Sequence, residues 1–264
     1  LYINYSMKKL YYLLLSFILI SCSKDGNITE SVDLYFKPRN CSNIFAVAGL
    51  KTETNLNGSL YYLYTDIPTG SQSITVNSFF LSVISSNYNI SNLINKEWSS
   101  IFYPLNVEND VFNNHDLNIE EQIKADYSKY LKSISKNKRE YSLALMPVEY
   151  RLTPIKDFKI TANCSLFGKQ AGENLNNYFS IEYFQPKLII SSKNNSLAFG
   201  FSDNELPTSI DEWLALSPMA QPAMYLELKS APPELPQTVQ FTVEMETDTG
   251  AKLTYTSFPV TLTK

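Results

Sequence analysis

Histidine is almost missing from this sequence, since His115 is the only one among 264 residues. A Ser-His-Asp triad, a Cys-His pair or a histidine-based zinc site would have to use that residue. It lies in a polar stretch, Asn113-Asn114-His115-Asp116, and the chain holds no nucleophile-elbow motif, glycine-rich phosphate loop or dinucleotide fingerprint. We therefore predict a non-enzymatic protein with no catalytic residues, no metal site and no cofactor.

The sequence has no excess of positive charge, because its 26 acidic residues outnumber its 22 lysines and arginines. The formal net charge is -4 and the pI is near 5.2. A nucleic-acid partner normally requires a basic face, so we exclude one. Chemistry that uses only carboxylates stays open, since a glycosidase needs two acids that the fold brings together. The acidic stretches 203–205 and 246–248 do not complete a calcium-binding loop. A carboxylate-dependent glycan hydrolase is therefore the alternative from the enzyme class.

Long apolar runs are confined to the N-terminus, where residues 10–20 follow Lys8 and Lys9. A relaxed membrane span needs about 20 apolar residues, so this run is too short to cross a bilayer. Positive charge followed by a short apolar core is the layout of a secretory signal. We interpret residues 1–21 as a signal peptide, with Met7 as the true start of translation.

The end of the apolar run, Leu19-Ile20-Ser21-Cys22, resembles the lipobox of bacterial lipoproteins, in which the cysteine is acylated and the signal is removed. The resemblance implies lipidation of Cys22 and a tether over residues 22–30. Two or more acyl chains give stable membrane anchoring. Ser23-Lys24-Asp25 resembles the export signal of surface lipoproteins of the Bacteroidetes, although an ordinary polar tether explains it equally well. We expect an outer-membrane location, on the surface or on the periplasmic face.

The two other cysteines, Cys41 and Cys164, have two interpretations. In an oxidising compartment they are candidates for a disulfide. They are equally candidates for separate buried thiols that pack as small hydrophobic side chains. The sequence alone gives no distance between them.

The clearest strand pattern lies at the C-terminus, where apolar and polar residues alternate over 237–246. That period of two indicates a half-buried strand. Asp248-Thr249-Gly250 predicts a turn, and residues 252–263 return as the partner strand of a hairpin. The apolar phase slips by one residue around Pro259, which predicts a bulge there.

Shorter segments along the rest of the chain also have strand composition, with asparagine and glycine clusters between them. Regularly spaced short strands are typical of a β-sandwich. We predict an all-β fold, a β-sandwich of immunoglobulin-like style, as one domain over 31–264. The expected strands are 32–36, 43–50, 60–64, 73–84, 151–162, 187–191 and 196–201.

Two segments have helical spacing instead. Apolar residues recur every three or four positions over 118–135, with Asp116 or Asn118 as the N-cap, which predicts an amphipathic helix that covers an edge or end of the sandwich. Ser209 and Glu212 have capping-box spacing and predict a short second helix over 209–216. A boundary near 136–140 is the alternative to a single domain.

The segment 148–179 resembles a group of Bacteroidetes lipoproteins of unknown function. The likeness rests on Tyr150-Arg151-Leu152, on Phe158-Lys159-Ile160-Thr161, and on the loop Ala171-Gly172-Glu173-Asn174-Leu175-Asn176 with Tyr178-Phe179. It implies an outer-membrane lipoprotein with a β-rich exterior domain, and it implies no activity. From the residues themselves, Gly172 favours a turn, while Leu175, Tyr178 and Phe179 favour packing into the core.

Trp98 and Trp213 are the only tryptophans, and they are candidate stacking platforms for a glycan. Core packing is the competing interpretation, because buried aromatics usually serve that role in sandwiches. Our leading hypothesis is a lipid-anchored surface protein that binds a glycan or an envelope protein. The alternatives are the carboxylate-dependent hydrolase and a structural subunit of an envelope assembly.

Overall fold

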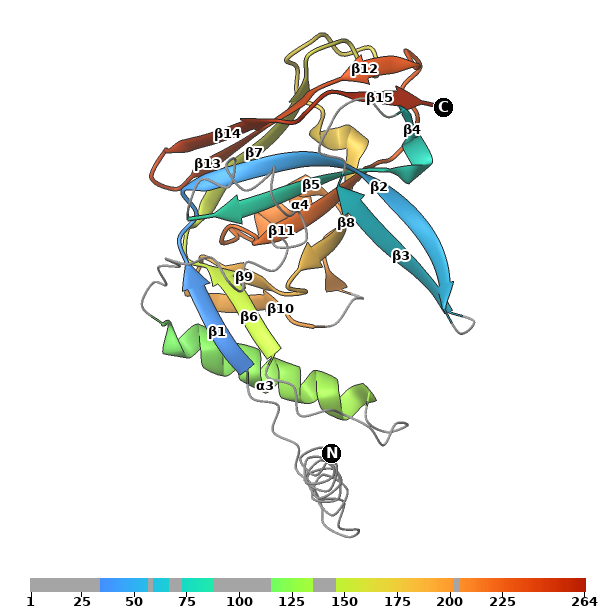
Figure 1. The fold of residues 1–264 in the computed structure, drawn as a ribbon. Coiled ribbons are helices and arrows are strands. Elements are labelled where there is room, and N and C mark those ends of the chain that lie inside the picture. The colour runs from blue at the N-terminus through green and yellow to red at the C-terminus, as the bar shows by residue number, and fades with distance from the viewer. Residues whose placement is uncertain (1–33, 57–58, 67–72, 88–114, 135–145, 202–204) are drawn as a thin grey trace, which may run out of the picture. The chain divides into compact units, whose positions relative to one another are not determined.

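A five-stranded antiparallel sheet occupies the centre of the computed structural model, which describes residues 34–56, 59–66, 73–87, 115–134, 146–201 and 205–264 (Figure 1). The strand order is β3-β2-β5-β11-β8. The strands are β2 (Asn43–Leu56), β3 (Ser59–Asp66), β5 (Phe79–Ser86), β8 (Phe179–Gln185) and β11 (Ala223–Leu228). All eight residues of β5 are buried, as expected for a strand in the middle of a sheet.

A second layer contains two three-stranded sheets, with the orders β14-β13-β7 and β12-β15-β4. The predicted C-terminal hairpin is confirmed, and each of its arms is divided between these two sheets. The return arm is divided at residues 257–259, between β14 and β15. This break includes Pro259, around which the alternation of apolar and polar residues shifts by one position. The strands are β4 (Ser73–Thr75), β7 (Ile155–Ala162), β12 (Gln237–Val239), β13 (Phe241–Thr247), β14 (Lys252–Thr256) and β15 (Val260–Thr263).

The main core lies between these layers. The Phe241 ring of β13 contacts Phe79 of β5 at a centroid distance of 5.5 Å and Phe179 of β8 at 5.6 Å. Leu175 and Phe179, from the loop that we predicted to pack inward, are buried in the same cluster. Gly172 has a φ of +83°, a conformation that glycine adopts without steric cost. The prediction of an all-β, sandwich-like fold is confirmed.

The short helix α4 (Ile210–Ala215) packs on the main core. Its predicted capping box is confirmed, because the Glu212 amide donates to Ser209 Oγ at 3.2 Å and the Ser209 amide donates to Glu212 Oε2 at 3.1 Å. Two single turns of 3-10 helix, η1 (Val76–Ser78) and η4 (Asn176–Tyr178), lead into β5 and β8.

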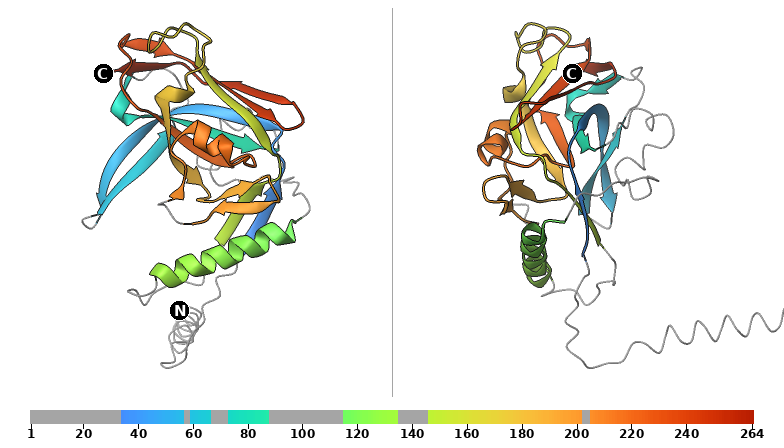
Figure 2. Two further views of the ribbon diagram at one scale, coloured as in Figure 1. Left: turned by 180° about the vertical axis from the view of Figure 1, so that it is seen from behind. Right: turned by 90° about the vertical axis from the view of Figure 1, so that its left-hand side faces the viewer.

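A second, smaller core forms under the long helix α3 (Leu117–Ile134), whose prediction is confirmed (Figures 1 and 2). Asp116 is its cap, since Asp116 Oδ1 accepts hydrogen bonds from the amides of Asn118 and Ile119 at 3.1 Å each. The helix packs with the parallel pair β1 (Leu34–Arg39) and β6 (Met146–Arg151) and with the hairpin β9 (Ile189–Ser191) and β10 (Ser196–Phe199). No helix among the described residues is long and apolar enough to cross a membrane.

Several strands differ from the predictions. β8 and β11 were not predicted, although β11 lies between two strands of the central sheet. The expected strand over 151–162 is divided, because Arg151 ends β6 and Ile155 begins β7. The described residues all belong to one compact unit of the chain, 34–139 and 146–264. The predicted signal, tether and alternative boundary near 136–140 lie outside the described residues.

Candidate functional site

The parallel pair β1 and β6 carries charged side chains into the interior. The register places Arg39 opposite Arg151, and Glu149 lies on the same side of β6 as Arg151 because side chains alternate along a strand. Arg39 is 0% exposed and Arg151 is 2% exposed. Burial of a charge is costly unless the charge is paired and hydrogen-bonded, so the contacts of these two guanidinium groups define the candidate site.

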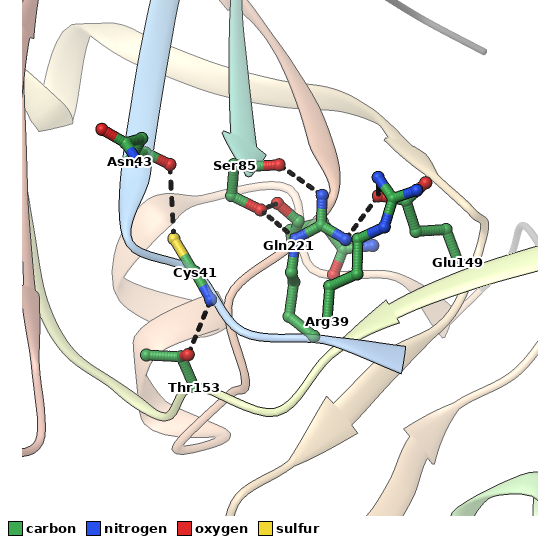
Figure 3. Close-up of polar contacts among 8 residues, drawn as sticks. Arg39, Cys41, Asn43, Ser85, Glu149, Thr153 and Gln221 are labelled. Atoms are coloured by element: carbon green, nitrogen blue, oxygen red, sulfur yellow. Dashed lines mark hydrogen bonds and ion pairs between the residues drawn. The ribbon is translucent and has the colours of Figure 1, made fainter. Parts of the chain in front are cut away.

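One carboxylate joins the two arginines. Glu149 Oε1 accepts a hydrogen bond from Nη1 of Arg39 at 3.3 Å and from Nη1 of Arg151 at 2.5 Å (Figure 3). Arg151 also donates from Nε to Ser85 Oγ at 2.9 Å and from Nη2 to the Ser85 carbonyl. Ser85 Oγ in turn donates to the Gln221 carbonyl at 2.8 Å. We call Arg39, Ser85, Glu149, Arg151 and Gln221 the arginine cluster.

The arginine cluster connects β1 and β6 to the central sheet. Ser85 belongs to β5, and its amide donates to the carbonyl of Pro222, next to the start of β11, at 3.0 Å. Gln221 Nε2 donates to the carbonyls of Pro186 and Leu188 at 3.0 Å each, which fixes the segment between β8 and β9. The cluster therefore holds together segments that are far apart in the sequence.

The geometry of Ser85 does not suit nucleophilic catalysis. A serine nucleophile gives its proton to an adjacent general base such as histidine. Here the hydroxyl proton goes to the Gln221 carbonyl, and a lone pair of the oxygen receives the Arg151 hydrogen bond. Ser85 therefore acts as a structural link between a buried guanidinium and the backbone.

Cys41 lies beside the cluster, two residues after β1 (Figure 3). Its amide donates to Thr153 Oγ1 at 2.8 Å, and its thiol contacts the Asn43 carbonyl at 3.6 Å. Burial raises the pKa of the Cys41 thiol to about 11, although the Arg151 charge acts in the opposite direction. Since the thiolate is the reactive form, Cys41 is an unreactive buried thiol near neutral pH.

The possible disulfide between Cys41 and Cys164 is not formed, and both cysteines are free. Cys41 is bound to Thr153, just before β7, whereas Cys164 follows the other end of that strand and its thiol is 3.9 Å from the Thr238 carbonyl. A strand of eight residues is roughly 26 Å long. A disulfide needs Cα atoms within about 7 Å of each other, so the fold keeps the two thiols apart.

Thiol titration tests this arrangement. After unfolding without a reductant, we expect a protein that begins after Cys22 to show two reactive thiols, those of Cys41 and Cys164. In the native protein Cys164 reacts first, since Cys41 is only 6% exposed and its pKa is raised to about 11. Cys41→Ala and Cys164→Ala should each leave one thiol. A protein with no reactive thiol until reductant is added would contradict the structure.

His115 lies directly before α3 and contacts a buried carboxylate. Its Nδ1 is 2.6 Å from Glu120 Oε1, which also accepts a hydrogen bond from the Tyr150 hydroxyl at 2.9 Å. The Asp116 amide donates to the same hydroxyl at 3.1 Å. Burial raises the pKa of Tyr150 far above its ordinary value. These contacts attach the start of α3 to β6, and His115 itself is half exposed.

The structure corrects the prediction for Trp213. Its side chain is 0% exposed and packs edge to face on Phe158, with the ring centroids 5.7 Å apart. A stacking platform needs an open ring face, so Trp213 is a core residue and not a glycan site. Trp98, the other predicted platform, and Cys22, the predicted lipid site, lie outside the described residues.

The acidic stretch 246–248 does not assemble a cation site. Glu246 Oε1 accepts a hydrogen bond from Lys156 Nζ at 2.9 Å, and Lys252 Nζ lies 3.8 Å from the other oxygen. In the part of the chain that the structure describes, no group of three or more histidine, cysteine or acidic residues is arranged to hold a metal ion. Asp203 and Asn204 of the other acidic stretch lie outside the described residues.

The sequence analysis did not single out the arginine cluster. The sequence does contain a local sign of the cluster, because Arg39 and Arg151 each end a strand in which every second residue is apolar. An arginine at a strand end is usually solvated, so only the pairing of β1 with β6 identifies it as buried.

Comparison with known proteins gives no match, since no family model, no curated protein and no solved structure matches the chain.

Proposed function

We propose that this chain is a lipid-anchored protein of the bacterial outer membrane with a non-catalytic binding or structural role. The observation that carries the proposal is the N-terminal sequence, in which Lys8 and Lys9, the apolar run 10–20 and Leu19-Ile20-Ser21-Cys22 follow in the order of a lipoprotein signal. Its partners are the membrane, through the lipid on Cys22, and a glycan or envelope protein that contacts the β domain.

The contacts of the polar side chains support the non-catalytic part of the proposal. Glu149 is shared by two arginines, and Glu120 is held by Tyr150 and His115. A glycosidase needs one carboxylic acid and one carboxylate that both face the substrate. Glu120 and Glu149 instead connect elements of the fold, so no contact among the described residues favours the hydrolase over a binding or structural role.

Replacing Cys22 by alanine tests the anchor. We expect cells fed an alkyne-tagged fatty acid to label the wild-type protein and not the variant, because acylation requires the Cys22 thiol. The variant should also accumulate as the longer precursor, since removal of the signal depends on the lipid. Electrophoresis after conjugation of a fluorophore measures both effects.

Cys164→Ala is the matched control, because it removes a cysteine that the lipobox does not include, and it should keep the full label. Continued acyl labelling of Cys22→Ala would refute the lipid assignment. Digestion of intact cells by an added protease then separates the two faces of the membrane. Loss of the wild-type band indicates the surface, and full protection indicates the periplasmic face.

A further inference from the structure

The loop before η4 runs along the side of β7 that faces away from β13. Among the strands that the structure describes, β13 is the only one paired with β7, which ends the order β14-β13-β7. In an antiparallel pair, every second residue of a strand directs its N–H and C=O groups away from the partner strand. Such an edge can pair with a strand of another chain unless the protein covers it.

Backbone amides of the loop bind two carbonyl groups on this edge. The Leu175 amide donates to the Ile160 carbonyl at 2.8 Å, and the Gly172 amide donates to the Ala162 carbonyl at 2.9 Å. Leu175 is buried in the main core, so its packing holds the loop beside the strand. The loop 172–176, which the sequence analysis singled out, therefore lies on the outer edge of β7.

The side chain of Asn176 occupies the next positions on the edge. Its Oδ1 accepts a hydrogen bond from the Ile160 amide at 2.9 Å, and its Nδ2 donates to the Phe158 carbonyl at 2.7 Å. A residue of a neighbouring parallel strand would make the same pair of bonds, since its C=O and N–H groups bind residues two positions apart. A carboxamide carries both a donor and an acceptor, so Asn176 takes the place of a strand there.

The same arrangement recurs on β10, beside α3 (Figure 1). In the described part of the chain, β10 pairs with β9 alone. Gln122 Oε1 of α3 accepts a hydrogen bond from the Leu197 amide at 2.9 Å, and Gln122 Nε2 donates to the Asn195 carbonyl at 3.4 Å. These backbone groups again belong to residues two positions apart. Just beyond β10, Asp126 Oδ2 accepts a hydrogen bond from the Phe201 amide at 3.0 Å.

We propose that the carboxamides of Asn176 and Gln122 are edge caps, which keep β7 and β10 from pairing with a strand of another chain. Covering an edge with a loop or a helix is one of the ways in which proteins prevent sheets from joining edge to edge. The inference goes beyond the proposed anchoring and binding roles, and it does not depend on the lipid.

Removal of a cap leaves backbone groups that need a new partner. Ile160 is 0% exposed and Phe158 is 1% exposed, so water does not readily replace the Asn176 carboxamide at their N–H and C=O groups. A buried backbone group without a hydrogen bond is destabilising. A strand of a second copy would satisfy both groups at once, which makes self-association the expected result of opening the edge.

Asn176→Ala in the full-length protein tests the cap on β7. We expect the mass of the protein in a mild detergent, measured by light scattering after size exclusion, to rise about twofold or more relative to the wild type, because the opened edges pair. Gln122→Ala tests the cap on β10 and should raise the mass in the same way. Alanine is the best helix former, so this second variant keeps α3 intact.

Two controls separate edge pairing from a general loss of stability. Ser257→Ala removes the hydroxyl that accepts a hydrogen bond from the buried Phe241 amide at 3.0 Å, and Phe241 belongs to the central strand of its sheet. Asn176→Asp loses the bond to the Phe158 carbonyl but places a charge on the edge, and charged side chains block strand pairing. Both variants should keep the wild-type mass, as should Lys129→Ala, which changes an exposed residue of α3.

Melting curves identify the variants that are folded, and the masses are compared below the melting transition. If Asn176→Ala does not fold, the mass of Gln122→Ala decides the outcome. Wild-type mass in every folded variant that lacks a cap overturns the proposal. Equal association of Ser257→Ala or Lys129→Ala also overturns it, since that result indicates exposure of the core and not of an edge. Acylation of Cys22 does not affect the comparison, because every variant is measured against the wild type in the same detergent.

Discussion

Replacement of Glu149 by leucine is expected to lower the free energy of unfolding by about 3–5 kcal/mol, which is the usual cost of removing one partner from a buried ion pair. Glu149 Oε1 receives hydrogen bonds from both Arg39 and Arg151, and the register places these two arginines opposite each other. The substitution therefore leaves two adjacent cations without the carboxylate that they share. Urea denaturation followed by far-ultraviolet circular dichroism measures the loss.

The triple substitution Arg39→Met, Glu149→Leu and Arg151→Met should regain most of that stability. Apolar residues of similar volume can replace a buried ionic group without a net cost, because its desolvation penalty disappears together with its attraction. Ser85 would lose the Arg151 hydrogen bonds and keep the one to Gln221, so we expect the recovery to be incomplete.

Glu244→Leu is the matched control on the surface. Glu244 pairs with Lys252 at 2.9 Å, and the lysine side chain is 57% exposed. Exposed ion pairs contribute about 1 kcal/mol or less, so this variant should unfold close to the wild type. If Glu149→Leu cost no more than Glu244→Leu, the arginine cluster would not hold β1 and β6 in place.

The elements that the sequence predicted well are those with local signals. The C-terminal hairpin follows from the alternation of apolar and polar residues on both sides of Asp248-Thr249-Gly250, which shifts by one residue only near Pro259, and Gly250 has a φ of +83°, as that turn requires. The helix α3 follows from its apolar spacing and its Asp116 cap, and α4 follows from the capping box of Ser209 and Glu212. Each of these signals lies within a few residues of the element that it specifies.

The missing parts of the prediction depend on contacts between distant segments. β11 has five buried residues out of six, and a short apolar run of that kind fits a strand and a buried helical segment equally well. Arg39 and Glu149 are 110 positions apart, so no local pattern connects them. Whether Cys41 and Cys164 could form a disulfide also depends on their distance in the fold, and β7 keeps the two cysteines apart.

The sequence also left the environment of the tryptophans open. A capping box places Trp213 on a helix and does not say which face of the helix meets the core. The packing of α4 against β7 and β8 decides the outcome, and it buries the indole completely. Trp213 therefore belongs to the stability of the fold, which leads to the second large effect that we expect.

Trp213→Ala is expected to lower the free energy of unfolding by about 3–5 kcal/mol, because truncation of a fully buried aromatic side chain removes its transfer energy and leaves a cavity. The loss includes the edge-to-face contact with Phe158. Circular dichroism in urea measures the change without relying on tryptophan fluorescence, which the substitution itself alters. A loss of glycan binding in this variant would therefore report unfolding and not a missing platform.

Trp213→Phe separates packing from hydrogen bonding at the same position. Trp213 Nε1 is buried and has no hydrogen-bond partner among the described residues, and a buried donor without a partner costs about 1–3 kcal/mol. Phenylalanine fills part of the volume and removes that donor, so we expect this variant to lose less than half of what Trp213→Ala loses. If both variants were as stable as the wild type, Trp213 would lie at the surface, and its role as a glycan platform would be open again.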